Sequence, residues 1–192
     1  MALIVKHRDD FGVLLDNLKL NGMGIEIGVN EGTYSDVLLS KTRLQKIYFV
    51  DPWKEFISNE QKDNAYYGSQ KTLDDRYKMV VEKLKKYGER VAILRKDSVE
   101  ALQDFSNDYF DFIYIDAVHT YEYVKKDMNS WYPKLKHGGV FAGHDYAKDT
   151  ISSLGVYGVK SAVDEFCQER NIKMSLTGGS RRCPPSWYFI KV

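Results

Sequence analysis

The feature that most constrains this chain is the stretch from Met23 to Asp36, which combines a strand, a glycine turn and a helix start. Alternating apolar residues lead into a glycine, the pattern of a short buried strand that ends in a turn: Met23, Ile25, Ile27 and Gly28. After Gly32 the sequence opens a helix, with Thr33 or Ser35 as its expected cap. Glycine lets the backbone approach a ligand closely, and free amides at a helix start favour an anionic group. The stretch therefore predicts a ligand cradle, with an ordinary tight turn as the alternative.

Glu26, two residues before Gly28, distinguishes between two ligands for this cradle. A nicotinamide dinucleotide would bring its anionic pyrophosphate to the turn, where a carboxylate is a poor neighbour. S-adenosyl-L-methionine (SAM) would bring an ammonium and a sulfonium, which a carboxylate stabilises. The spacing ExGxxxG therefore favours SAM over NAD. The cofactor-binding residues expected in this stretch are Glu26, Gly28, Asn30, Gly32 and Ser35.

Two further strands predict the rest of the cofactor site. Residues 46–50 lead to Asp51, and an acid about 20 residues after the glycine turn reaches the ribose hydroxyls in a βαβ unit. Trp53 follows and is included in the predicted site. Residues 91–94 lead to Asp97 and Ser98. The side chain of Asp97 and the backbone amide of Ser98 could contact the adenine. The alternatives are a simple turn at Asp51 and helix capping by Asp97 or Ser98.

The sequence IDAVHTYEYVKKDM, from Ile115 to Met128, is the second informative stretch. Asp116 follows an apolar strand, and His119 lies in the loop after it. The next strand, expected over residues 140–143 after a turn at Gly138-Gly139, ends in His144 and Asp145. In an open parallel sheet, ligands bind outside the carboxyl ends of the strands, so these side chains should converge beside the cradle. The candidate catalytic residues are Asp116, His119 and His144, and the candidate metal ligands are Asp116, His144 and Asp145.

Length and composition are those of one soluble domain spanning residues 1–192, with a leading helix in 1–20 and a lid loop at 53–69. The net charge of +1 gives no case for a nucleic-acid or membrane partner. No apolar run approaches the ~18 residues of a transmembrane helix, and the first residues are too short a run for a signal peptide, so we expect a cytoplasmic protein. The two cysteines, Cys167 and Cys183, are expected to be reduced thiols.

The remaining periodicity completes an alternation of strands and helices. Apolar residues at helical spacing predict helices over 72–87 and 158–170, with a loop before the second one up to about Gly155. The apolar runs at 173–176 and 187–192 predict two final strands that form a terminal hairpin.

With these stretches in place, the chain resembles the class I SAM-dependent methyltransferases, and within them methyltransferase family 24. The stretches that carry the resemblance are EIGVNEGTYS, VDPW, IDAVHTYEYVKKD, GGVFAGHDY and SWY. The resemblance implies an α/β fold with a Rossmann-like doubly wound sheet of seven strands. That sheet should be mostly parallel, with an antiparallel C-terminal strand and helices on both faces. It also implies relatedness to metal-dependent small-molecule O-methyltransferases.

Two residues depart from that pattern. Asn30 stands where many class I enzymes have a glycine, so we expect a loop that turns less tightly around the methionine moiety. The relatives that bind a metal have an Asp-Asp or Asp-Asn pair after the fifth strand, where this chain has His144-Asp145. Two routes to an activated hydroxyl stay open: Mg²⁺ or another divalent cation held by Asp116 and Asp145, or a general base, His119 or His144.

The sequence favours an O-methyltransferase that acts on a hydroxylated small molecule, such as a sugar or natural-product intermediate. A SAM-binding protein without transfer activity, metal-free methylation and an NAD-dependent oxidoreductase are the alternatives. The last is disfavoured by Glu26 and by the absence of GxGxxG. A leading helix and exposed aromatic residues would suit a homodimer.

Overall fold

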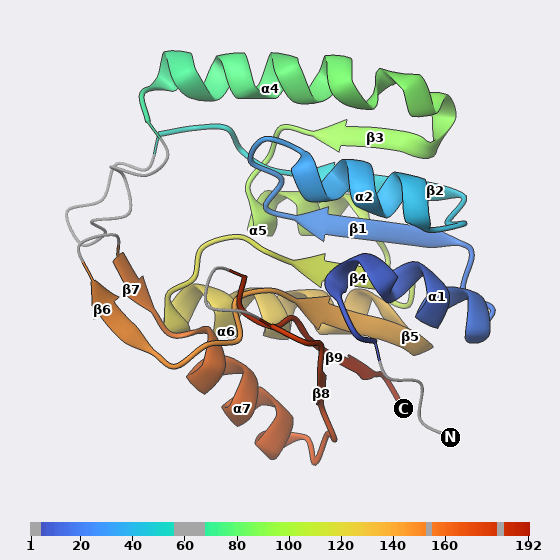
Figure 1. Ribbon diagram of the computed structural model, residues 1–192, viewed down its shortest axis with the longest axis vertical. Helices are drawn as coiled ribbons and strands as arrows, with labels where there is room; N and C mark the ends of the chain where they lie inside the picture. Colours follow the sequence, from blue (N-terminus) through green and yellow to red (C-terminus); the bar gives the residue numbers. More distant parts are fainter. Residues whose placement is uncertain (1–4, 56–67, 153–154, 180–182) are drawn as a thin grey trace.

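The computed structural model describes residues 5–55, 68–152, 155–179 and 183–192. Its centre is a seven-stranded sheet with the strand order β3-β2-β1-β4-β5-β9-β8 (Figure 1). The strands are β1 (Met23–Ile27), β2 (Lys46–Val50), β3 (Val91–Leu94), β4 (Phe110–Ile115), β5 (Leu135–Gly143), β8 (Ser175–Leu176) and β9 (Trp187–Ile190). The first five strands are parallel, and β9 runs antiparallel to both β5 and β8. The predicted fold class is confirmed.

The strand register places the carboxyl ends of the central strands side by side. Ile27 at the end of β1 pairs with Val50 of β2 on one side and Ile115 of β4 on the other. Ile115 also pairs with Gly143 of β5. The residues that directly follow these strands therefore share one edge of the sheet, which is where an open parallel sheet binds ligands.

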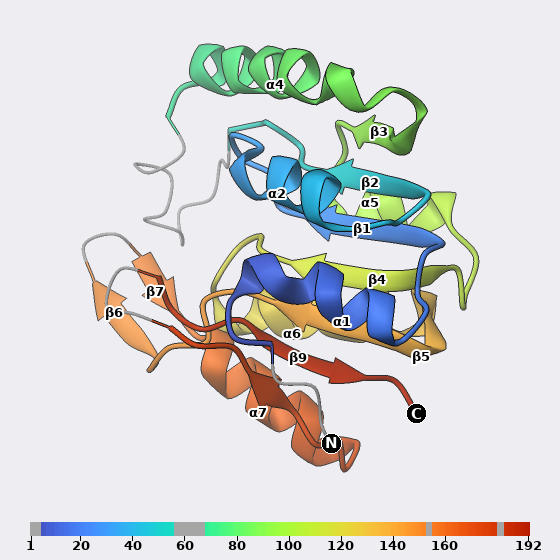
Figure 2. The ribbon, with the colours of Figure 1, turned by 45° about the vertical axis from the view of Figure 1, so that its right-hand side comes forward.

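Helices cover both faces of the sheet, as Figures 1 and 2 show. Their bounds are α1 (Phe11–Asn17), α2 (Thr33–Lys41), α4 (Gln70–Leu84), α5 (Ser98–Ala101), α6 (Tyr121–Trp131) and α7 (Val159–Glu169). Alternate residues of β4 point to opposite faces: Phe112 and Tyr114 pack with α1, α2 and α4, whereas Ile113 and Ile115 pack with α5, α6 and α7. This alternation follows from the two-residue period of a strand and divides the core into two layers.

Short 3₁₀ turns extend several of these helices: η1 (Arg8–Asp10), η2 (Lys85–Arg90), η3 (Leu102–Asp104) and η4 (Tyr132–Lys134). The leading helix is accordingly shorter than expected, with η1 and α1 inside the predicted range 1–20. Among the described residues, none of the helices is both long enough and apolar enough to cross a membrane.

The structure corrects three sequence-based boundaries. Strand β5 begins at Leu135 instead of Val140, because the strand continues through the Gly138-Gly139 pair. The expected loop before Gly155 contains a small antiparallel sheet, β6 (Thr150–Ser152) with β7 (Gly155–Tyr157), whose strands are too short to show a period. Both final strands are shorter than predicted, since pairing covers only Ser175–Leu176 and Trp187–Ile190. Most of the predicted lid at 53–69 lies outside the described residues.

Candidate active site

The glycine turn after β1 forms a tight cradle against the end of β4. Gly28 has φ 90°, and a Cβ atom there would lie 2.1 Å from the carbonyl oxygen of Asp116. Gly32 has φ 66° and is the N-cap of α2. No side chain caps this helix, so the predicted cap by Thr33 or Ser35 is wrong; left-handed Gly32 ends the loop instead. Only glycine fits at position 28.

Asn30 lies in the loop after β1 with a left-handed backbone. Its φ is 51°, in the region that asparagine tolerates better than most residues. The expectation that this loop turns less tightly around the methionine moiety stays a prediction. The indole N–H of Trp53 donates to the Asn30 carbonyl at 2.8 Å and helps to fix the turn.

Asp51 binds the cradle loop from the tip of β2. One carboxylate oxygen, Oδ2, accepts from the amides of Val29 and Asn30 at 3.0 and 2.9 Å. The other, Oδ1, accepts from the Trp53 amide at 2.8 Å. Burial raises the pKa of Asp51, and these three amide bonds only partly offset it. Two loop amides are thus already paired inside the protein, which leaves them unavailable to a pyrophosphate and works against a dinucleotide.

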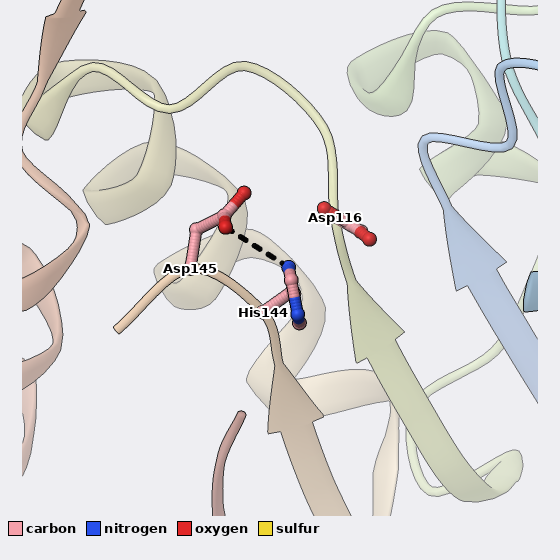
Figure 3. Close-up of side chains that lie close together, drawn as sticks. All are labelled: Asp116, His144 and Asp145. Atoms are coloured by element: carbon pink, nitrogen blue, oxygen red, sulfur yellow. Dashed lines mark ion pairs between the residues drawn. The ribbon is translucent and has the colours of Figure 1, made fainter. Parts of the chain in front are cut away.

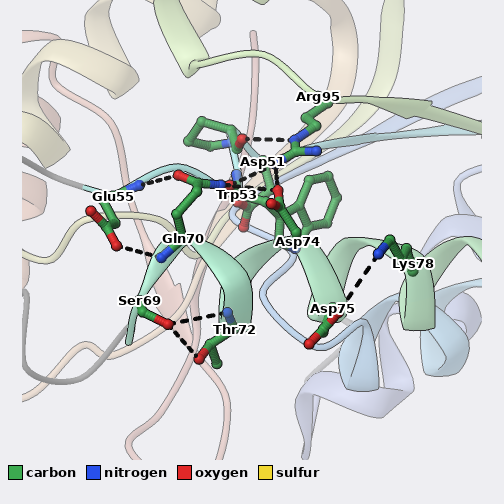
Figure 4. A network of polar contacts seen from close by, with 11 residues as sticks. Asp51, Trp53, Glu55, Ser69, Gln70, Thr72, Asp74, Asp75, Lys78 and Arg95 are labelled. Atoms are coloured by element: carbon green, nitrogen blue, oxygen red, sulfur yellow. Dashed lines mark hydrogen bonds and ion pairs between the residues drawn. The ribbon is translucent and has the colours of Figure 1, made fainter.

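Trp53 is 1% exposed and lies behind the cradle loop. Its carbonyl accepts from Gln70 Nε2 at 2.9 Å and Arg95 Nη2 at 3.0 Å, and Arg95 also pairs with Asp74 (Figure 4). This network joins the chain after β2 to the start of α4 and the end of β3. Trp53 therefore supports the cradle, and its predicted contact with the cofactor stays a prediction.

Glu26 is 1% exposed in the middle of β1. The Ser35 hydroxyl donates to its carboxyl Oε2 at 2.5 Å, and this bond joins strand β1 to helix α2. Burial raises the pKa of Glu26 well above its ordinary value, and the Ser35 hydrogen bond and the Arg8 charge only partly counter this. A cation brought by a ligand would lower the pKa of this buried carboxyl and stabilise its ionised form.

Asp97 and Ser98 lie at the tip of β3, and both have structural partners. The Asp97 carboxylate accepts from the Glu100 amide at 2.8 Å and caps α5. The Ser98 hydroxyl donates to Asp127 at 2.5 Å and accepts from the Trp131 indole at 2.8 Å. The capping alternative thus holds for Asp97, and an adenine contact by either residue stays a prediction.

Asp116, His144 and Asp145 converge at the ends of β4 and β5 (Figure 3). One ligand atom from each lies within 4.8 Å of the others. The His144 Nδ1 atom is 3.0 Å from Asp145 Oδ1, and its Nε2 faces the Cys183 sulfur at 3.7 Å. Two carboxylates and one imidazole fit a divalent cation; the carboxylates suit magnesium or manganese, and the imidazole suits iron or zinc. The convergence predicted from the sequence is therefore present.

His119 joins this cluster from the loop after β4. Its Nε2 atom lies 2.8 Å from Asp145 Oδ2 and 3.6 Å from Asp116 Oδ1, and its ring stacks on Tyr157. Burial lowers the pKa of His119, but the two carboxylates outweigh burial and raise it to about 10. Burial alone would raise the pKa of Asp145, but the two histidines have the larger effect and hold this pKa well below its usual range. At neutral pH His119 is therefore a cation, which makes it a poor proton acceptor.

Arg8 is a site residue that the sequence did not reveal. Its Nη1 atom lies 3.6 Å from Asp116 Oδ2, and its guanidinium covers the Tyr34 ring at 4.6 Å. No motif or spacing marks Arg8, because it precedes the first helix and reaches the sheet edge only through the tertiary fold. A partly buried cation next to the strand ends would have been the signal, and the burial of a single arginine cannot be read from one sequence.

The strand order, the glycine cradle after β1 and the acids at the strand tips define a Rossmann-like methyltransferase of class I. A family profile described as a methyltransferase domain, family 24, matches residues 25–146, which is more than half of the chain. The chain belongs to this family, and the resemblance carried by its motifs is confirmed.

A curated relative, an uncharacterised protein of Sinorhizobium fredii, is 25% identical over 123 residues. That match covers 64% of this chain, but the chain spans only 12% of the relative's length.

Solved structures share the fold at low identity. An O-methyltransferase from Bacillus cereus in complex with SAH is 12% identical with a TM-score of 0.67, over 95% of this chain and 80% of that one. An rRNA methylase from Streptococcus thermophilus is 14% identical with a TM-score of 0.61, over 100% and 99%. A precorrin-6y C5,15-methyltransferase from Geobacter metallireducens is 16% identical with a TM-score of 0.59, over 94% and 85%. Two of these descriptions name an acceptor, rRNA in one and precorrin-6y in the other, so the fold does not choose the acceptor.

Proposed function

We propose that this protein transfers the methyl group of SAM to a hydroxyl group of a small molecule, with a divalent cation held by Asp116, His144 and Asp145. The observation that carries the proposal is the convergence of these three side chains at the tips of β4 and β5, directly beside the cradle of β1. Membership of methyltransferase family 24 supports the methyl transfer.

The cofactor end of the proposal depends on Glu26, Gly28 and Asp51. Gly28 brings the β1 loop against β4, and Asp51 fixes the loop amides. Burial raises the pKa of the Glu26 carboxyl, and the ammonium and sulfonium of SAM would lower this pKa and stabilise the ionised carboxylate. Positioning the methyl group and excluding water supply most of the rate gain in such a transfer.

At the acceptor end, an alcohol must lose its proton as its oxygen bonds to the methyl carbon and the carbon–sulfur bond breaks. A divalent cation supplies the acidity that lets a chelated hydroxyl release its proton near neutral pH. The chain itself contributes two carboxylates, Asp116 and Asp145, and the His144 imidazole. His119, with its pKa raised to about 10 by those carboxylates against the effect of burial, is a poor base in the free protein. This favours the metal route over a general base at His119.

The experiment is an acceptor screen with SAM labelled in its methyl group. The protein is first stripped with EDTA, and Mg²⁺, Mn²⁺ or Zn²⁺ is then added back with catechols, sugars and other vicinal hydroxyl compounds. Transfer that EDTA abolishes and one cation restores supports the proposal. Transfer that survives complete removal of metal would support metal-free methylation. SAM binding without transfer to any acceptor would favour a SAM-binding protein without transfer activity.

A further inference from the structure

The N-terminal strap, residues 5–10, holds Arg8 in a fixed place over the edge of the sheet. The Val5 amide donates to the Tyr188 hydroxyl at 3.3 Å, and the Gly178 amide donates to the Lys6 carbonyl at 2.8 Å. The Tyr34 hydroxyl donates to the Arg8 carbonyl at 2.9 Å, while the Tyr34 ring lies under the guanidinium. Contacts to α2 and to the last strands thus position this side chain before any ligand arrives.

The guanidinium of Arg8 is partly buried and forms a long ion pair with Asp116. Its side chain is 23% exposed, and the Asp116 oxygen at 3.6 Å lies beyond hydrogen-bond distance. It also faces the Tyr114 hydroxyl. A guanidinium has five N–H donors, so it can bind a further anion beside these partners. Removing such a cation from water is costly unless an anion pairs with it.

The surroundings of Arg8 match the amino-acid end of SAM. That end is a zwitterion, so it needs one negative and one positive partner close together. Asp116 supplies negative charge 3.6 Å from Arg8, and a bound ammonium would add to the Arg8 charge in favouring the ionised form of the Glu26 carboxyl. A planar guanidinium also matches a carboxylate with two parallel hydrogen bonds.

We propose that Arg8 is the carboxylate anchor of this site, its guanidinium binding the carboxylate of a bound ligand. The inference rests on the proposed function. The carboxylate comes either from the methionyl group of SAM or from the acceptor. In both cases Arg8 is a binding residue contributed from outside the part of the chain that matches the family, residues 25–146.

The test compares binding of SAM and decarboxylated SAM, which lacks only the carboxylate, to the wild type, Arg8→Gln and Arg8→Lys. Arg43→Gln is the matched control, since that side chain is 82% exposed and pairs with Asp16 at the surface. If the methionyl carboxylate is the ligand, Arg8→Gln weakens SAM binding by roughly 10- to 100-fold. Binding of decarboxylated SAM then changes little, and Arg8→Lys falls between the wild type and Arg8→Gln.

If the acceptor supplies the carboxylate, SAM binding is unchanged in Arg8→Gln. The KM then rises roughly 10-fold or more for acceptors that carry a carboxylate, and not for their neutral analogues. The inference would be overturned if Arg8→Gln weakened the binding of SAM and of decarboxylated SAM equally. It would also be overturned if Arg8→Gln changed neither SAM binding nor the KM for acceptors that carry a carboxylate, and Arg8 would then be a structural counter-ion. Failure of the folded wild type to bind either compound would overturn the proposed function as well.

Discussion

The His119 Nε2 atom lies 2.8 Å from Asp145 Oδ2, although neither residue belongs to the cofactor cradle. This pair joins the loop after β4 to the loop after β5. Asp145 adopts φ 54°, in the left-handed region that aspartate tolerates better than most residues. The contact places a cation against the carboxylates that we propose as metal ligands, so His119 balances their charge in the free protein.

Stability should fall as pH rises through the range in which His119 loses its proton. Its folded-state pKa of about 10 exceeds the unfolded value of about 6.5, so the stabilisation is complete below pH 6.5 and is lost as pH rises towards 10. We expect His119→Gln to flatten this loss between pH 7 and 9.5 in urea denaturation. His137→Gln, a change at an exposed histidine of β5, should leave the profile of the wild type. An unchanged profile in His119→Gln would contradict the ion pair.

Metal binding should depend on His144 and not on His137, although both lie on or next to β5. His144→Ala removes one of three ligands and should weaken Mn²⁺ binding by at least 10-fold in calorimetry. The His137→Ala control should bind Mn²⁺ like the wild type. Equal binding by the two variants would remove His144 from the metal site.

Gly28→Ala should destabilise the protein far more than Gly138→Ala does. Both glycines have positive φ, 90° and 79°, so both substitutions have a backbone cost of about 1 to 2 kcal/mol. Only at Gly28 would the new Cβ collide with backbone, 2.1 Å from the Asp116 oxygen, whereas Gly138 has open space. We expect a total loss of about 3 kcal/mol or more for Gly28→Ala, together with weaker SAM binding. Similar unfolding midpoints for the two variants would contradict the close contact between position 28 and the Asp116 carbonyl oxygen.

Asp127→Asn should stabilise the protein at high pH. Burial raises the pKa of Asp127 to about 6, against the lowering effect of its bond from Ser98. Because the pKa of Asp127 is higher in the folded state than in the unfolded state, ionisation of this acid destabilises the folded protein. Above pH 6 this destabilisation reaches up to about 3 kcal/mol. Denaturation at pH 8 should show a gain of about 1 to 3 kcal/mol in the variant, and little gain at pH 4. Asp75→Asn, whose side chain is 60% exposed, should show neither effect.

Sequence patterns predicted the alternation of strands and helices and the strand tips well, because both follow from local rules, whereas the seven-stranded sheet with its antiparallel last strand was implied by the family resemblance. Alternating apolar residues located β1, apolar runs located β2 and β4, and the glycine turn located the cradle. Parallel topology then brought Asp116, His144 and Asp145 together, as expected for residues at neighbouring carboxyl ends. The misplaced start of β5 came from reading Gly138-Gly139 as a turn, although both glycines lie within the strand.

Other features depended on contacts between distant segments and could not be read in advance. Trp53 supports the cradle from behind, because its indole reaches the Asn30 carbonyl across the loop. The raised pKa of His119 requires two carboxylates from different loops, whose effect exceeds that of burial. Arg8 reaches Asp116 over more than a hundred residues of sequence, with no spacing to indicate it.

The central claim, a SAM cradle built around Glu26, is tested most directly by calorimetric titration with SAM, with NAD in parallel. We expect micromolar SAM binding to the wild type, no heat with NAD, and at least 10-fold weaker SAM binding in Glu26→Gln. Because Glu26 is buried and its pKa is raised by burial, this variant should be at least as stable as the wild type at neutral pH, so a loss of binding would not reflect unfolding. Equal affinity of Glu26→Gln for SAM, or NAD binding by the wild type, would contradict the account.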